Sequence, residues 1–92
     1  MIELMNKNYP IHFDSIEFFR DGGSTSYILF SGEEKYFLRV IKPAFFDTAI
    51  KAADIQVFLQ NREFPVPRVI FSKTDLPYVK TEDGLYILYE IY

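Results

Sequence analysis

A run of glycine and hydroxyl residues separates two segments that are rich in strand-forming side chains: Gly22, Gly23, Ser24, Thr25 and Ser26. Glycines let a backbone approach an anion closely, and successive N–H groups and hydroxyls can point toward it. The run is therefore a candidate loop for covering phosphate groups. An ordinary hairpin turn uses the same residue types, so the local sequence leaves both interpretations open.

Arg39 is a cation within a predicted strand, residues 35–41, that is apolar on both faces. Strand alternation puts it on one face together with Phe37 and Ile41. A fixed cation on a third strand can neutralise the α- and β-phosphates of a nucleotide. Its guanidinium is planar and bidentate, so it would hold phosphate differently from a lysine. The alternative is a structural arginine that snorkels to solvent or forms an ion pair.

Asp54 is the only acidic residue in the interior of the main predicted helix, residues 48–61. On a helical wheel it lies among apolar residues, and a carboxylate in such surroundings needs a partner, for which Arg39 is the candidate. A solvated aspartate on the helix surface is the alternative. Gln56 and Gln60 share the other side of the wheel, so the wide apolar belt is predicted to pack against the sheet.

The remaining ionisable residues form no catalytic or metal-binding group. His12, the sole histidine, precedes the predicted strands and is expected on the surface. The acidic pairs at residues 33–34 and 82–83 fall in predicted turns, where solvated carboxylates are expected rather than an acid–base couple or a metal site. We therefore assign no catalytic and no metal-binding residue to the chain.

Length and composition indicate a single domain, residues 1–92. With 49% hydrophobic and 25% charged residues, the 92-residue chain favours one compact fold and is too short for two cores. The net charge is −3 and the basic residues are scattered, which disfavours nucleic-acid and membrane binding. There is no cysteine and no recognisable targeting or spanning segment, so a cytoplasmic location is expected.

Alternating apolar patterns and turn residues predict an antiparallel five-stranded sheet with one main helix. A polar lead-in ends at Pro10, Asp47 is the expected N-cap of the helix, and Pro65 follows the helix end. Strands are predicted at residues 16–20, 27–30, 35–41, 69–71 and 78–80, with a last segment at 85–92. The predicted fold class is α+β in the order β-β-β-α-β-β.

The order of these elements carries a resemblance. It consists of the Gly-rich β-turn-β, the strand ending Phe37-Leu38-Arg39-Val40, a single helix, the run Phe64-Pro65-Val66-Pro67-Arg68-Val69-Ile70, and a final Leu88-Tyr89-Glu90-Ile91-Tyr92. Together they resemble the N-terminal lobe of the aminoglycoside phosphotransferase family, the small-molecule branch of the protein-kinase-like fold that includes choline-kinase-like enzymes. The resemblance covers nearly all of residues 14–92.

The resemblance implies a set of nucleotide contacts. The loop would cover the phosphates, Arg39 would neutralise them, and Asp54 would pair with Arg39, although the family uses Glu and the register falls nearer Ala52. A hinge at the last segment would meet adenine through its backbone, unless its tyrosines merely pack in a sheet strand. The implied nucleotide-binding residues are Gly22, Gly23, Ser24, Thr25, Ser26, Arg39, Asp54, Tyr89, Glu90 and Tyr92.

In the family, the catalytic aspartate and the metal-binding groups lie in a C-terminal lobe, which would begin beyond Tyr92. The resemblance therefore implies the nucleotide-binding half of an ATP-dependent phosphotransferase that acts on a small-molecule hydroxyl, with the C-terminal catalytic lobe absent. Such a half would be inactive on its own and would bind ATP weakly or not at all. Mg²⁺ and the acceptor would be held only through the missing lobe.

Other functional classes remain as alternatives. One is a stand-alone protein-interaction module with a kinase-like N-lobe fold, and another is an RNA-binding sheet, which the acidic balance disfavours. A homodimer is also expected, because a lobe that ends at its hinge would leave Phe37 and Tyr89 bare. Its last strand could then pair or exchange with a second copy.

Overall fold

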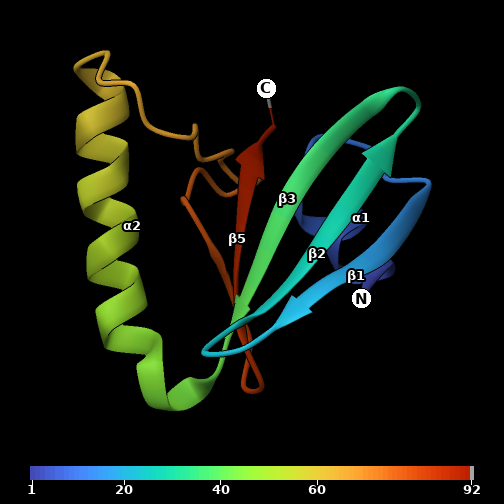
Figure 1. Cartoon of the computed structure of the whole chain (residues 1–92), viewed down its shortest axis with the longest axis horizontal. Helices are drawn as coiled ribbons and strands as arrows, with labels where there is room; N and C mark the ends of the chain where they lie inside the picture. The colour runs from blue at the N-terminus through green and yellow to red at the C-terminus, as the bar shows by residue number, and fades with distance from the viewer. Residues whose placement is uncertain (92) are drawn as a thin grey trace.

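A five-stranded antiparallel sheet is the centre of the computed structural model, which describes residues 1–91 (Figure 1). Its strands follow the order β1-β2-β3-β5-β4. Their bounds are β1 Ser15–Asp21, β2 Thr25–Ser31, β3 Glu34–Ile41, β4 Val79–Lys80 and β5 Leu85–Glu90. The helices are α1 Ile2–Asn8, the single 3₁₀ turn Pro43–Phe45 and α2 Phe46–Asn61. The predicted α+β class and the five-stranded antiparallel sheet are confirmed.

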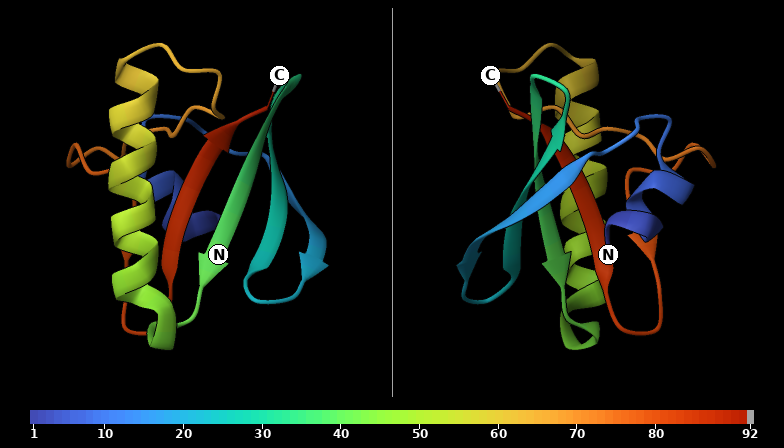
Figure 2. Two further views of the ribbon diagram at one scale, coloured as in Figure 1. Left: turned by 60° about the vertical axis from the view of Figure 1, so that its left-hand side comes forward. Right: turned by 90° about the vertical axis from the view of Figure 1, so that its right-hand side faces the viewer.

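The two helices lie on opposite faces of the sheet (Figure 2). Side chains alternate along β5, so neighbouring residues belong to different cores. On the α2 side, the buried cluster contains Ile41, Ala53, Val69, Leu85, Ile87 and Tyr89. On the α1 side, it contains Met5, Tyr9, Phe13, Leu29, Leu38 and Leu88. Burial on both faces explains why the strand segments are apolar on both sides.

The expectation that the first ten residues are a polar lead-in is wrong. They include α1, and the side chains of Met5 and Tyr9 are 0% and 1% exposed. The spacing of Ile2, Met5 and Tyr9 places all three on one helical face, which packs on the sheet. A helix of seven residues without a cap is too short to be stable alone, so this packing must hold it.

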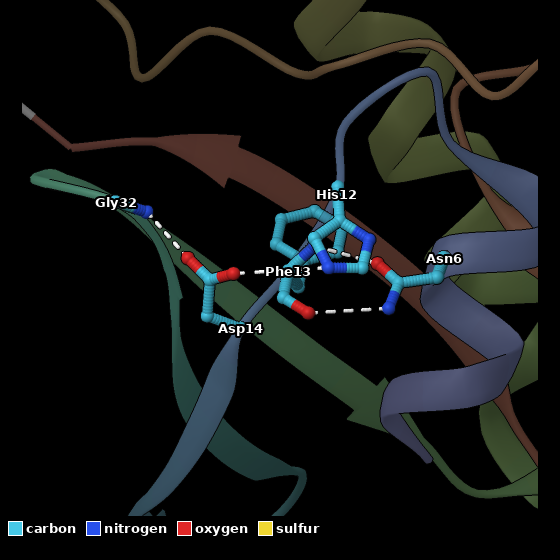
Figure 3. A network of polar contacts seen from close by, with 5 residues as sticks. All are labelled: Asn6, His12, Phe13, Asp14 and Gly32. Atoms are coloured by element: carbon cyan, nitrogen blue, oxygen red, sulfur yellow. Dashed lines mark hydrogen bonds and ion pairs between the residues drawn. The ribbon is translucent and has the colours of Figure 1, made fainter.

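Polar contacts fix the segment between α1 and β1 (Figure 3). The Asn6 side chain accepts from the Phe13 N–H at 2.6 Å and donates to the Phe13 carbonyl at 3.1 Å. The Asp14 carboxylate accepts from the Gly32 N–H at 2.7 Å and lies 3.7 Å from His12 Nε2. The His12 side chain is 80% exposed, so its predicted surface location is confirmed.

Two features of α2 differ from the expectation. Asp47 is not the N-cap: the helix begins at Phe46, Asp47 lies in the first turn, and no side chain caps the end. The predicted apolar belt is confirmed only in part: Ile50 and Val57 pack on the sheet core, but Ile55 and Phe58 are 61% and 54% exposed while Gln60 is buried. The sheet-facing side of α2 therefore contains an amide side chain as well as apolar ones.

The segment between α2 and β5 is mostly irregular. The strand predicted at residues 69–71 is reduced to one bridge between Val69 and Tyr89, and the strand predicted at 78–80 forms as β4. The Ile70 N–H donates to the Leu88 carbonyl at 2.9 Å, so this segment still follows the edge of β5. Within residues 1–91, no helix combines the length and apolarity needed to cross a membrane.

Substituting Tyr9 tests the α1-side core. Its hydroxyl is buried and has no hydrogen-bond partner in residues 1–91, so Tyr9→Phe should raise the free energy of unfolding by about 1 kcal/mol at pH 7. Burial, with a smaller contribution from Tyr89, raises the pKa of this hydroxyl above its unfolded value. Ionisation of Tyr9 therefore leaves stability unchanged below about pH 10 and lowers it as the pH rises further, because the unfolded state loses the proton first.

Urea unfolding between pH 7 and 11 measures both effects. Wild-type stability should fall above about pH 10, and Tyr9→Phe should fall less steeply. Tyr27→Phe, which changes a half-buried ring on the same face, is the matched control and should shift stability by less than about 0.5 kcal/mol. A Tyr9→Phe protein that is less stable than wild type at pH 7 would show that the hydroxyl is not a burden.

Candidate functional site

The face of the sheet that carries Arg39 is hollowed in three adjoining places. The helix hollow, about 400 Å³, lies between this face and α2. The aromatic hollow, about 660 Å³, is lined by Phe19, Phe37 and Tyr89 with other residues. The loop hollow, about 340 Å³, lies beside residues 22–24. Arg39 lines all three, so its side chain is where they meet.

Arg39 lies on the α2 side of β3, as strand alternation predicted. It is half-buried and stands opposite Ser26 of β2 and Ile87 of β5. Its Nε donates to Ser24 Oγ at 3.5 Å, the long limit of a hydrogen bond, which orients the guanidinium toward the loop. The predicted face is confirmed, and the predicted contact with phosphate stays a prediction.

The glycines of the loop are not explained by the turn. Neither Gly22 nor Gly23 has a left-handed backbone, and a Cβ atom at either position would meet nothing within 4 Å. Asp21 closes the turn instead, since its Oδ1 accepts from the Gly22 N–H and from Thr25 Oγ1, each at 3.1 Å. A hairpin alone therefore does not require glycine here, which weakens that alternative.

The predicted pairing of Asp54 with Arg39 does not occur. Asp54 is exposed, and across residues 1–91 the one ion pair joins His12 and Asp14. The helix faces Arg39 with Ala52, Ala53 and Gln56, which line the helix hollow with it. The register that falls nearer Ala52 is therefore the observed one, and α2 supplies no carboxylate to the site.

The structure describes two of the three predicted hinge residues, Tyr89 and Glu90. Tyr89 is 6% exposed, and its ring centroid lies 6.2 Å from that of Phe37, so the expectation that Tyr89 is bare is wrong. Glu90 lines the aromatic hollow, and its N–H donates to the Arg68 carbonyl at 2.9 Å. Tyr92 lies outside the described residues. Contact between adenine and this segment stays a prediction.

Two glutamines that the sequence analysis gave no role form the wall of the site. The buried Gln60 side chain accepts from the Val69 N–H at 2.8 Å and donates to the Val69 carbonyl at 3.3 Å. One turn earlier, Gln56 Nε2 donates to the Pro67 carbonyl at 2.7 Å. This glutamine clip, Gln56 and Gln60, ties residues 67–69 to α2. The four-residue spacing of two glutamines beside a Pro-containing run was the available signal.

Comparison with known proteins places this geometry in a fold. No protein-family model matches the chain, and no curated protein matches it in sequence. Two solved structures of spectinomycin phosphotransferase APH(9)-Ia do match, each at 16% identity over 99% of this chain. The complex with ADP and spectinomycin gives a TM-score of 0.79, and the AMP-bound complex gives 0.69.

The chain has the fold of the N-terminal lobe of an aminoglycoside phosphotransferase. The resemblance inferred from the sequence is thereby confirmed at the level of the fold. The chain corresponds to 28% and 27% of the length of the two phosphotransferase chains.

Replacing Gln60 tests the glutamine clip. Gln60→Leu keeps the volume but leaves the buried N–H and C=O of Val69 without partners, so the free energy of unfolding should fall by about 2–4 kcal/mol. Gln56→Leu is the matched control, because its bond to Pro67 is exposed and its loss should cost about 1 kcal/mol or less. Equal losses in the two variants, measured by urea unfolding, would contradict the assignment.

Proposed function

We propose that the chain is the nucleotide-binding part of an ATP-dependent phosphotransferase that acts on a small-molecule hydroxyl. The observation that supports this most directly is Arg39, a half-buried cation where three hollows meet, with no carboxylate paired to it in the described chain. The fold adds support, since the similar solved structures are complexes of a phosphotransferase with ADP or AMP.

In this proposal the phosphates lie over Arg39 and the loop. Phosphoryl transfer depends on positioning and on neutralising phosphate charge, and an unpaired guanidinium can give its full charge and two parallel N–H bonds to phosphate oxygens. Ser24, which already contacts Arg39, lines the loop hollow with Gly22 and Gly23 and covers the same end of the site. Thr25 is left out of this set, because it stands opposite Val40 on the α1 side of the sheet. Asp54 is excluded from this set because it is exposed on α2 and does not contact Arg39.

The base would lie at the other end, over the aromatic hollow. Phe37 packs edge-on against Phe19, with centroids 5.9 Å apart, and stands beside Tyr89. An apolar aromatic lining of this kind suits a purine ring. The backbone at Glu90 and Ile91, which line the same hollow, would then meet the edge of the base through groups other than the Glu90 N–H, which is bonded to the Arg68 carbonyl.

The groups that perform transfer are proposed to lie outside these residues. Residues 1–91 bring together no three His, Cys, Asp or Glu side chains that could hold a metal ion, so none of them is assigned to Mg²⁺. The catalytic base, Mg²⁺ and the acceptor are therefore assigned to the part of a phosphotransferase that this chain does not span. We propose the cytoplasm as the location, since ATP is the proposed ligand.

The binding role of Arg39 can be measured by titrating the chain with ATP and following backbone amide shifts. ATP should bind weakly, with shifts at Gly23, Ser24 and Tyr89, because one lobe contacts only one side of the ligand. Arg39→Gln should weaken binding by about 10-fold, the loss expected for a charge-assisted pair. Arg62→Gln, which changes an arginine stacked on Phe58 at the far end of α2, should bind like the wild type.

The same protein, incubated with labelled ATP, Mg²⁺ and a panel of amino sugars and amino alcohols, should give no labelled product. Phosphoryl transfer catalysed by this chain alone would contradict the proposal that the catalytic groups lie outside residues 1–91. Equal ATP affinity in the wild type and Arg39→Gln would contradict the phosphate role of Arg39.

We also propose that two copies of the chain associate. This is a specific case of the protein-interaction alternative, and the exposed edge of the sheet favours it. β1 is an edge strand of the sheet, and its Phe18 and Phe19 are 64% and 55% exposed. An exposed apolar edge strand is a ready site for pairing with another strand. We therefore propose β1, and not the last strand, as the contact between the copies.

Light scattering coupled to size exclusion tests the association. At micromolar concentration the wild type should give twice the mass of one chain. Phe18→Lys should give a monomer, because a charge on the free edge opposes strand pairing. Phe58→Lys, which changes another exposed phenylalanine on α2, is the control and should remain dimeric. A wild-type monomer at every accessible concentration would exclude the proposal.

A further inference from the structure

Arg20, Ser26 and Arg39 stand in one row across three strands. Arg20 of β1 is opposite Ser26 of β2, and Ser26 is opposite Arg39 of β3. Directly opposed residues share a face of the sheet, so all three lie on the α2 side. Strands are about 4.8 Å apart, which puts the two arginine backbones about 10 Å apart with the serine between them. The three side chains line the loop hollow together.

An irregularity in β1 brings Arg20 into this row. The pairing register shifts between Phe18 and Arg20, so Phe19 is an extra residue of the bulge type. In a regular strand Phe19 would oppose Ser26, and Arg20 would point to the α1 side. Bulges commonly re-aim a side chain beside a functional site. Here the bulge leaves both Phe19 and Arg20 lining hollows on the α2 side.

The row carries two positive charges with no carboxylate among the residues lining the loop hollow. The nearest acid along the chain, Asp21, is bonded to Gly22 and Thr25 within the turn, and Glu90 lines the neighbouring aromatic hollow. Like charges on one face of a sheet repel each other. An anion between the two arginines would turn this repulsion into attraction.

Ser26 is a second, independent sign of a ligand. Its side chain is only 9% exposed, it lines the loop hollow, and its hydroxyl makes no hydrogen bond to any described residue. The hydroxyl lines the hollow between the two guanidinium groups, where it is placed to donate to an anion.

We propose that Arg20, Ser26 and Arg39 form a binding site for a diphosphate unit, in which Arg20 and Arg39 each hold one phosphate group. This deepens the proposed function and rests on it for the nucleotide as the source of the diphosphate. Two guanidinium groups about 10 Å apart at the backbone match two linked phosphates better than one, since each can bind oxygens in a bidentate way. Arg20 therefore makes the site select ATP and ADP over AMP.

Calorimetric titration of five proteins tests this site: the wild type, Arg20→Gln, Arg20→Lys, Arg39→Gln and, as the control for lost charge, Arg62→Gln. Each is titrated with pyrophosphate, ATP and AMP. Arg20→Gln should weaken pyrophosphate and ATP about 10-fold and leave AMP within about 2-fold, because AMP offers no second phosphate. Arg20→Lys should recover part of the loss. Arg20 is exposed on an edge strand, so circular dichroism should show an unchanged fold.

The outcomes separate the site from the nucleotide function. If Arg20→Gln binds pyrophosphate and ATP like the wild type while Arg39→Gln does not, the two-arginine site is wrong and the proposed function stands. If pyrophosphate binding depends on both arginines but ATP binds no better than pyrophosphate, the diphosphate site holds and the nucleotide function fails. No binding of any phosphate compound by the wild type overturns both.

Discussion

The helix hollow beside Arg39 depends on the hydrogen bonds of the buried Gln60 amide. The side of α2 that lines the helix hollow presents mainly small residues, while Phe46, Ile50 and Val57 pack on the core beside it. The paired hydrogen bonds from Gln60 to Val69 add a polar attachment at the end of the helix, through a segment that itself bonds to β5. Because the alanines are small, the helix can be fixed in this way and a hollow can still remain beside Arg39.

The opposite face of the sheet holds β1 in place. β1 pairs with a neighbour on one edge only, yet it must keep Arg20 level with Ser26. Tyr9 and Phe13 anchor the chain just before β1 in the α1-side core, and Asn6 and Asp14 fix its backbone by hydrogen bonds. The packing of a seven-residue helix on one face therefore positions a charged residue on the other.

Much of the fold and part of the site could be predicted from the sequence. The strands around Arg39 alternate clearly, so its face followed from the pattern alone. Helix α1 did not, because seven residues give too few turns for periodicity to stand out. The position of Gln60 on the sheet-facing side of α2 was missed because a helical wheel treats glutamine as polar. In the structure its amide is buried, with both of its hydrogen bonds made to the backbone of Val69. No residue type marks the bulge at Phe19 in the sequence. The face on which Arg20 lies could therefore be found only from the strand pairing in the structure.

The distribution of charge gives the last constraint on the site. The chain has a net charge of −3, and 13 acidic residues would be enough to pair every one of its 10 basic ones. Among the described residues, neither Arg20 nor Arg39 has an acidic partner, although α2 could have offered Asp54 from the facing helix. Arg20 lies over the Phe19 ring and Arg39 contacts Ser24, so both guanidinium groups keep their charge available at the hollow. The arrangement is consistent with a site whose missing partner is an anion supplied from solution.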